Sequence, residues 1–447
     1  MEQTEKKKFG EEKLVDSLLY QKLLQASDSL PLFFLILAIL FEYLRPQNTF
    51  APLGGIKAPF IINILSFLVI IPYLARGWNR PNVVMVAFLV YNALYIILGR
   101  FIVDSWVVND GRALFAWIAL MFAYLSIALG LSKLCLFKKP LMSIAKVFSL
   151  TAGLLGVYAI THGGKGPGGW IGDENDCCFA ILTLFPFCLF VLSQSRSFLL
   201  KTFSLTLLCF SLGGIVASFS RGGFLSLIIS AAFLFWQSPY KIRFFMAALF
   251  VVCAAIPFVP DKYWLEISTI TQTKSGTAQQ RREYWAAATK VWLYQSNVIF
   301  GVGPNNAPYW MDNFQEDKIT RPSFAGRQVH STYLQLLADL GLIGLTFFIF
   351  TIGAAFWRSI VIFKNSSRLF FALARDSEES IALSEELRFV RYYAMAINAA
   401  FVGGLFAALF VSVLYYPPLW VLMGLAAGLE SYYGQVQTLI SRHLIKP

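Results

Sequence analysis

Continuous apolar runs of about 20 residues recur along most of this chain, and they restrict its fold more than any other feature. A run of this length crosses a bilayer as an α-helix, which satisfies its own backbone hydrogen bonds where no water is present. Hydrophobic residues make up 57% of the chain and charged residues only 14%, against roughly 25% charged in soluble proteins. The alternation typical of a membrane barrel is missing from the sequence. The sequence therefore predicts an all-α, polytopic integral membrane protein.

We expect about twelve transmembrane helices by the 20-residue criterion. The longest stretch between two spans is 261–331, and loops of such length are usually functional or disordered. Trp and Tyr residues flank helical patterns within it, so we expect it to be ordered and partly helical. The predicted spans are 29–44, 58–75, 82–99, 113–131, 142–160, 177–193, 198–218, 222–238, 244–260, 332–357, 392–415 and 418–435.

The distribution of Lys and Arg predicts the orientation, because cytoplasmic loops carry an excess of these residues. With the N-terminus in the cytosol, the short inner loops hold more of them than the outer loops. The net charge of +12 is then mainly a topology signal, and nucleic acid is not needed to explain it. The inner set is Arg76, Arg80, Lys133, Lys138, Lys139, Lys146, Arg196, Lys201, Lys241 and Arg243, and the outer set is Arg45, Lys57, Arg100, Arg112, Lys165 and Arg221.

These expectations divide the chain into five parts. The charged first segment lacks the early apolar core of a cleavable signal peptide, so we expect it to be cytosolic. The six cysteines show neither metal-ligand spacing nor a disulfide framework. The parts are a cytosolic segment 1–28, transmembrane helices one to nine in 29–260, a large outer loop 261–331, helices ten to twelve in 332–435 with a cytosolic loop 361–391, and a cytosolic tail 436–447.

Arg221 lies in a tight turn between two predicted spans on the outer side. An arginine at that depth is costly unless it is paired or lines a cavity, which makes it a candidate functional residue. The alternative is an interfacial side chain that snorkels to the membrane surface. Gly222 and Gly223 follow it and leave the backbone open to close approach.

The outer loop contains a second pair of candidates, Arg281 and Arg282, at the start of a predicted helix. Helix N-termini favour anions, and guanidinium groups bind phosphate oxygens in a bidentate fashion. A solvated basic pair at a helix end is the alternative. A Gly/Pro turn at 301–306 ends this pattern.

Arg321, Arg327 and His330 follow within ten residues and lead into the predicted span 332–357. A single histidine is usually structural, although it is also the side chain best suited to act as a base near neutral pH. Ser331, Gln335 and Asp339 share one face of that span through four-residue spacing. Asp339 must then face protein or water and not lipid.

A glycine-rich outer stretch, 161–178, carries Asp173, Glu174 and Asp176. It has neither a preceding strand nor a Gly-Lys-Ser/Thr ending, so it is not a phosphate-binding P-loop. A flexible loop is the simpler interpretation, and its acids are candidates for contact with an acceptor sugar.

Taken in order, these residues resemble the O-antigen ligase family and its polymerase relatives. The predicted topology, with both termini inside and one large outer loop before the histidine helix, also agrees. The matching motifs are His330-Ser331, nine residues and then Gly341 and Gly344; Arg221 with Leu225; and Arg281 with Trp285, followed by Gly301 and Gly303.

The resemblance implies a membrane-embedded, metal-independent, inverting glycosyltransferase without a cofactor. Such an enzyme moves a glycan from undecaprenyl diphosphate to an acceptor hydroxyl, such as a lipid A core sugar, on the periplasmic face of the bacterial inner membrane. His330 would be the base. Diphosphate contacts would come from Arg221 and from Arg281 or Arg282, with Arg321 and Arg327 as further contacts, and Ser331, Gln335, Asp339, Gly341 and Gly344 would support the site.

Several alternatives stay open. A polymerase would use another carrier-linked glycan as acceptor, and a protein O-oligosaccharyltransferase would use Ser or Thr; both are relatives of the same superfamily. A lipid-linked sugar transporter is a different class. Transporters often show internal repeats, which we do not find, and the candidate residues lie on one predicted face of the membrane.

Overall fold

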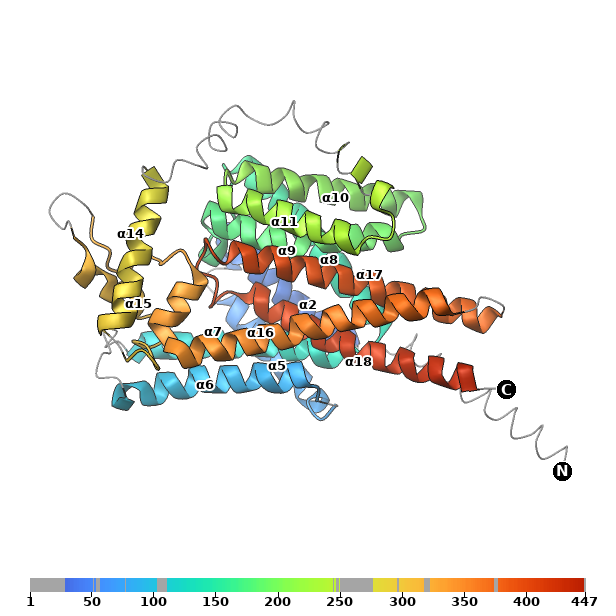
Figure 1. Ribbon diagram of the computed structural model, residues 1–447, viewed down its shortest axis with the longest axis horizontal. Helices are drawn as coiled ribbons and strands as arrows, with labels where there is room; N and C mark the ends of the chain where they lie inside the picture. The colour runs from blue at the N-terminus through green and yellow to red at the C-terminus, as the bar shows by residue number, and fades with distance from the viewer. Residues whose placement is uncertain are drawn as a thin grey trace.

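The computed structural model describes residues 29–50, 52–53, 57–76, 78–102, 111–243, 245–246, 249, 276–295, 297–316, 322–373 and 377–445. Across these residues the chain forms helices and turns, with one isolated bridge between Asn297 and Gly301 and no β-strand. Long helices lie roughly side by side in a bundle, and α14 and α15 lie together at one end of it (Figure 1). The C-terminal end of α18 lies at the opposite end (Figure 1).

The helices follow the apolar pattern of the sequence closely. In the first half they are α2 (Ser29–Leu44), α3 (Pro46–Thr49), α5 (Ala58–Ile70), η1 (Ile71–Tyr73), α6 (Arg80–Ile102), α7 (Gly111–Leu134), α8 (Lys138–Thr161), η2 (Gly169–Ile171), α9 (Glu174–Gln194), α10 (Phe198–Ala217) and α11 (Arg221–Gln237). In the second half they are α14 (Gly276–Lys290), a π-helical turn η4 (Val291–Gln295), α15 (Ala307–Trp310), η5 (Met311–Phe314), α16 (Thr332–Ala372), α17 (Glu378–Ala407) and α18 (Pro417–Ile445).

Within the described residues, five helices are long and apolar enough to cross a membrane: α8, α9, α10, α16 and α17. Shorter apolar helices lie at Ser29–Leu44, Ala58–Tyr73, Leu120–Leu134 and Arg221–Gln237. An all-α, multi-pass membrane protein is therefore confirmed, while the number twelve stays a prediction. A helix overlaps every predicted span except 244–260, most of which lies outside the described residues.

The boundaries near the C-terminus differ from the predicted ones. Helix α16 continues to Ala372 and α17 already starts at Glu378, so the segment 361–391 consists largely of the adjoining ends of two long helices. Helix α17 ends at Ala407, and a turn at 408–416 leads to α18. Hydrophobicity continues through this turn, which is why the sequence suggested one span to 415.

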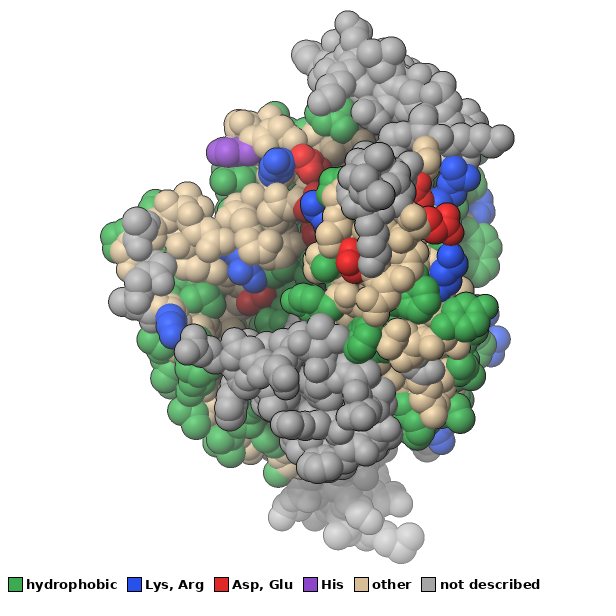
Figure 2. Space-filling view, turned by 90° about the vertical axis from the view of Figure 1, so that its left-hand side faces the viewer, with side chains coloured by type: hydrophobic (Ala, Val, Ile, Leu, Met, Phe, Trp, Pro, Cys, Tyr) green, Lys and Arg blue, Asp and Glu red, His purple; other side chains and the backbone are tan. Residues whose placement is uncertain are grey.

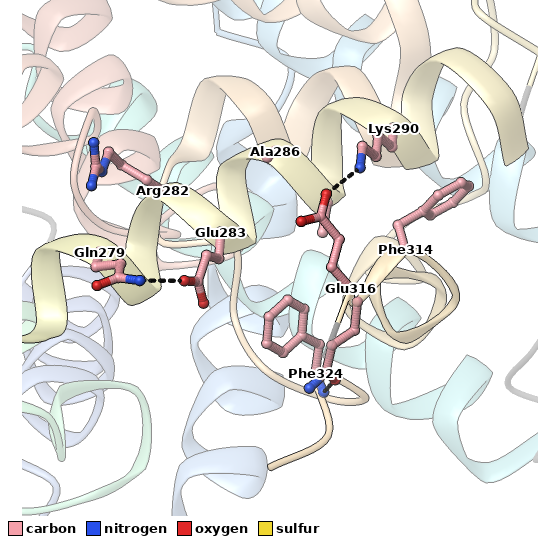
Figure 3. A pocket seen from close by; sticks show the side chains of 10 residues that line it. Gln279, Arg282, Glu283, Ala286, Lys290, Phe314, Glu316 and Phe324 are labelled. Carbon is pink, nitrogen blue, oxygen red and sulfur yellow. Dashed lines mark hydrogen bonds and ion pairs between the residues drawn. The ribbon is translucent and has the colours of Figure 1, made fainter. Parts of the chain in front are cut away.

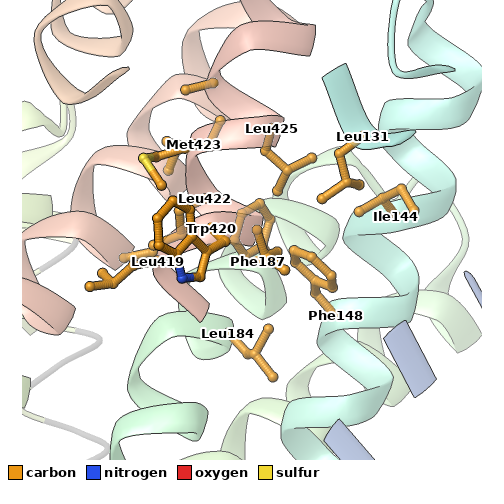
Figure 4. Close-up of a cluster of buried hydrophobic side chains, with 14 of the residues drawn as sticks. Leu131, Ile144, Phe148, Leu184, Phe187, Leu419, Trp420, Leu422, Met423 and Leu425 are labelled. Atoms are coloured by element: carbon orange, nitrogen blue, oxygen red, sulfur yellow. The ribbon is translucent and has the colours of Figure 1, made fainter. Parts of the chain in front are cut away.

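Helix α9 lies at the centre of the bundle. The share of buried residues is 83% in its most apolar window and only 33% in that of α10, which therefore lies at the periphery. The core around α9 is aromatic: the rings of Phe148 on α8 and Phe187 on α9 meet edge to face at 5.1 Å. Leu184 of α9 and Trp420 of α18 lie in the same cluster (Figure 4). This packing holds the N-terminal end of α9 at the end of the bundle where α14 lies.

Candidate active site

His330 occupies an unusual backbone conformation directly before α16. Its φ is +54°, a left-handed value that non-glycine residues seldom adopt. Two side chains hold the residue there: its N–H donates to Ser412 Oγ at 3.0 Å, and its carbonyl accepts from Trp285 Nε1 at 3.2 Å. His330 is thus fixed between α14 and the turn that joins α17 to α18.

The same turn fixes the start of α16. The Thr332 N–H donates to the Ala408 carbonyl at 2.9 Å. The Thr332 hydroxyl donates to the Val411 carbonyl at 2.7 Å and accepts from the Val413 N–H at 2.9 Å. The helix that presents His330 is therefore anchored at its first residue.

Arg281 and Arg282 are adjacent on α14 but have different surroundings. Tyr284, one turn further along, stacks its ring against the His330 ring with centroids 6.1 Å apart. Arg281 interacts electrostatically with His330, whereas Arg282 is exposed and lines a cavity elsewhere on α14. The structure therefore favours Arg281 over Arg282 as the partner of His330.

Arg281 belongs to a cluster of like and opposite charges. Burial lowers the pKa of its guanidinium, and the positive charge of Arg221 lowers that pKa further. The carboxylates of Asp173 and Asp176 act in the opposite direction. Two arginines from distant parts of the sequence are thus brought together, with two acids beside them (Figure 2 shows basic and acidic side chains close together at this end).

The same surroundings keep His330 neutral. Burial lowers the pKa of its imidazole to about 4, the charge of Arg281 adds to this effect, and Asp173 opposes it. At pH 7 the ring therefore has a free nitrogen lone pair that can accept a proton.

The acids of the glycine-rich stretch form the remaining side of the cluster. Asp173 caps α9 and accepts from the Asn175 N–H at 2.9 Å. Burial raises the pKa of Asp173, but hydrogen bonds with Asn175 and Glu174, together with the interaction with His330, leave that pKa below its ordinary value. Asp176 is buried and accepts from the Tyr416 hydroxyl at 3.3 Å, and that hydroxyl also accepts from Gln328 Nε2 at 3.1 Å.

Arg221 is the first residue of α11, and its neighbours fix that helix end. The Ser220 hydroxyl accepts from the Gly223 N–H at 3.0 Å and donates to Asn175 Oδ1 at 2.8 Å. A Cβ on Gly222 would contact the Phe410 ring, and one on Gly223 would contact Cys178 Sγ. The expected close approach to these two glycines is made by side chains of the protein itself.

Asp339, an acid within the apolar part of α16, holds the turn before α15. Its Oδ1 accepts from the Ala307 N–H at 2.8 Å, and its Oδ2 accepts from the Tyr415 hydroxyl at 3.3 Å. The side chain is fully enclosed by protein. It satisfies a backbone donor that would otherwise be buried without a partner.

The segment 298–303 of the large loop lies against a break in α16. Gly341, at this break, has a φ of 64° and a ψ of −162°, which are non-helical. The loop replaces helical hydrogen bonds on both sides of the break. The four bonds run from Leu342 N–H to Val298 O (3.1 Å), Ile343 N–H to Ile299 O (3.2 Å), Val302 N–H to Ala338 O (2.9 Å) and Gly303 N–H to Asp339 O (2.8 Å).

Glycine is required on both sides of this contact, on the docked segment and on α16. A Cβ on Gly341 would contact the Ile299 carbonyl, and one on Gly301 would contact the Asp339 backbone. Gly341 thus receives a loop and not a neighbouring helix, and Leu340 of the same helix lies next to Gly344. The glycine motif at 301–303 and the glycine motif at 341–344 therefore belong to segments that contact each other.

The other predicted residues lie at varying distances from the cluster. Arg327 is exposed, and its charge influences the pKa of Tyr284, so it lies nearby. Ser331 and Gln335 are buried, and Gln335 Nε2 donates to Asn305 Oδ1 at 3.5 Å. Arg321 lies outside the described residues. In the described part of the chain no group of three or more His, Cys, Asp or Glu side chains is suited to a metal ion.

Sequence reasoning missed several neighbours of the cluster. Ser412 lies in a turn that the apolar pattern assigned to the predicted span 392–415, and Tyr416 lies directly after that span. Gln328 gave no signal of its own. The consecutive prolines at 417 and 418 are the one signal for this turn, since proline favours the first turn of a helix. Asp173 and Asp176 were noted as acids, but not as neighbours of Arg281.

The comparisons with known proteins agree with the motifs. Residues 205–349 match the family model described as O-antigen ligase. This range contains the predicted base, the predicted diphosphate contacts and their supporting residues, from Arg221 to Gly344, but not the acids at 173–176. No curated protein matches the chain. Residues 205–349 are thus similar to the O-antigen ligase family, and this match supports a function of the ligase or polymerase type.

Proposed function

We propose that this protein is an O-antigen ligase-type glycosyltransferase. It moves a glycan from undecaprenyl diphosphate to an acceptor hydroxyl, such as that of a lipid A core sugar, at the periplasmic face of the inner membrane. The observation that carries the proposal is the cluster of a neutral His330 with Arg281 and Arg221 at one end of the helix bundle. A neutral base beside two guanidiniums suits transfer from a diphosphate.

In the proposed reaction the acceptor oxygen attacks the anomeric carbon of the donor sugar. The bond from that carbon to the phosphate oxygen breaks, and its electron pair leaves with the diphosphate. His330 takes the hydroxyl proton. Arg221 and Arg281 neutralise the charge that develops on the leaving group, which is the main requirement of this step. Attack from the face opposite the leaving group inverts the anomeric centre.

Because its pKa is low, His330 becomes an effective base only when the donor is bound. With a pKa of about 4 the imidazole is neutral at pH 7 but holds a proton weakly. A diphosphate bound to the arginines adds negative charge near the ring and raises this pKa toward neutrality. Donor binding would thus strengthen the base at the moment when it is needed.

The polymerase and protein O-oligosaccharyltransferase alternatives use the same donor and differ in acceptor. A lipid-linked sugar transporter would move the donor across the membrane without breaking the sugar–phosphate bond. Purified protein in lipid nanodiscs, supplied with an undecaprenyl diphosphate-linked glycan and a panel of acceptors, separates these functions. Attachment to lipid A core indicates a ligase, growth of the carrier-linked chain a polymerase, and attachment to Ser or Thr a protein transferase.

The histidine variants test the mechanism in the same assay. We expect His330→Ala to abolish transfer, because no other neutral imidazole lies in the cluster among the described residues. His162→Ala is the matched control, since His162 is exposed, stacks on Tyr158 and hydrogen-bonds with Tyr158 and Thr161. Full transfer by His330→Ala, with normal folding, would remove His330 as the base.

A further inference from the structure

A cavity lies beside the large loop, on α14 but apart from the charge cluster. Its volume is about 380 Å³, within the range of small-ligand sites. The floor is the α14 surface around Ala286 and Ala287, and the opposite wall comes from Phe314, Gln315, Glu316 and Phe324. Figure 3 shows the side chains of both walls around this space, with Arg282 at one end and Lys290 at the other.

The lining combines polar groups with aromatic rings, and the charges of its described residues sum to zero. Two cations, Arg282 and Lys290, are balanced by two anions, Glu283 and Glu316. Lys290 Nζ lies 3.0 Å from Glu316 Oε1, and Glu283 accepts from Gln279 Nε2 at 3.0 Å (Figure 3). Phe314 and Phe324 supply the apolar surface. Carboxylates and amides bind hydroxyl groups, and an aromatic ring packs against the C–H face of a sugar.

This chemistry discriminates between ligand classes. A phosphate would meet the two carboxylates as well as the two cations, so the cavity offers it no net electrostatic attraction. A purely apolar ligand would bury charged side chains without replacing their hydrogen bonds with water. A neutral ligand with many hydroxyl groups needs no net electrostatic attraction and can hydrogen-bond with the charged side chains.

The cavity is connected to the candidate active site through one aromatic side chain. Phe324 in the cavity wall packs edge to face on Tyr284, with ring centroids 4.8 Å apart, and Tyr284 stacks on His330 at 6.1 Å. The distance across an α-helix with its side chains is about 10–12 Å. A glycan whose terminal unit lies at His330 can therefore reach the cavity with a sugar one or a few units away.

We propose that this cavity is a second saccharide-binding site, which holds a neutral sugar of the glycan away from the reacting unit. The inference rests on the proposed function for its glycan substrate. It also reassigns Arg282, predicted from the sequence as a candidate diphosphate ligand, to the end of a sugar site. Such a site would retain long glycans during transfer without contacting the bond that breaks.

The test uses full-length protein in nanodiscs and the free oligosaccharide released from the donor lipid, which has no diphosphate. Binding is measured by saturation-transfer NMR and calorimetry. We expect wild type and His330→Ala to bind equally. Ala286→Trp, which fills the cavity from an exposed helical position, should lose binding, and Glu283→Gln should weaken it at least tenfold. Glu385→Gln, an exposed carboxylate paired with Arg196, is the matched control.

The outcomes separate the two proposals. Transfer activity without oligosaccharide binding by wild type, or binding that Ala286→Trp leaves intact, would overturn the saccharide site while the proposed function stands. Binding that depends on His330 but not on Glu283 would place the sugar at the active site and also overturn it. Binding lost in Ala286→Trp, in a protein that transfers nothing to any acceptor, would keep the site and refute the proposed function.

Discussion

At the scale of single residues, the environment of His330 decides what it can do. Burial and the charge of Arg281 bring its pKa to about 4, below the ordinary value of 6.5. The imidazole is therefore mostly neutral in the folded protein above pH 4. In an unfolded chain it is already mostly protonated below pH 6.5. Its contribution to stability is complete above pH 6.5 and is lost as the pH falls toward 4.

We predict that this titration can be observed directly. A His162→Gln, His443→Gln variant leaves His330 as the single histidine of the chain. Its ¹⁵N signals should change near pH 4, and addition of Arg281→Gln should move the midpoint upward, though not beyond 6.5, because burial is the larger cause. A midpoint near 6.5 in the unaltered site would contradict the buried, neutral imidazole.

The next prediction concerns the guanidinium groups of Arg221 and Arg281. Arg281→Lys and Arg221→Lys keep the charge but remove the planar fork that binds phosphate oxygens in pairs. We expect each to lower kcat/KM of transfer at least tenfold, and Arg282→Lys to lower it less than Arg281→Lys does. Arg196→Lys, in an exposed ion pair far along the chain, is the control and should match wild type. Equal losses for Arg281→Lys and Arg282→Lys would refute the division of roles across α14.

At the scale of elements, the break in α16 is the feature that organises the site. The docked segment 298–303 connects α14, which carries Arg281, to α16, which follows His330. Trp292 Nε1 also donates to the Val298 carbonyl at 3.0 Å, and the Tyr95 hydroxyl donates to the Gly301 carbonyl at 3.1 Å. The relative position of the arginine and the histidine therefore depends on this contact.

We predict that Gly341→Ala displaces the loop. The added methyl group would meet the Ile299 carbonyl, and the positive φ is unfavourable for alanine. The melting temperature should fall by several degrees and transfer by at least tenfold. Gly353→Ala on the same helix is the control, because nothing lies within 4 Å of its added Cβ. An alanine there should stabilise the helix slightly. Equal behaviour of the two variants would show that the docked loop is dispensable.

At the scale of the whole molecule, the arrangement of the helices gives the protein two unlike ends. Helices α14 and α15 lie at one end, and the C-terminal end of α18 lies at the other (Figure 1). Arg281 of the charge cluster lies on α14. The Lys and Arg distribution of the sequence predicts that the first end faces the periplasm.

We predict that labelling in intact cells will reveal this orientation. In a cysteine-free background, Ala325→Cys lies in an exposed turn near α14, and Ser441→Cys is exposed near the end of α18. A maleimide that does not cross the inner membrane should label Ala325→Cys in spheroplasts and Ser441→Cys only after permeabilisation. The reverse pattern would place the site in the cytosol and contradict the proposed function.

The sequence by itself determined the membrane class, the approximate helix positions and the identity of Arg221, Arg281 and His330 as candidates. Apolar length and charge position are local properties, and they act on each segment independently of the rest of the fold. Motif spacing adds the family, which the match over 205–349 supports.

Only the tertiary structure decided which arginine lies beside the histidine, why Asp339 is present, and what the glycines do. Arg281 and Arg282 are adjacent in sequence, and only the packing of α14 gives them different surroundings. The bonds of Asp339 reach Ala307 and Tyr415, 32 and 76 residues away. The break at Gly341 exists because a loop from another part of the chain supplies hydrogen bonds there, and no local pattern records that partner.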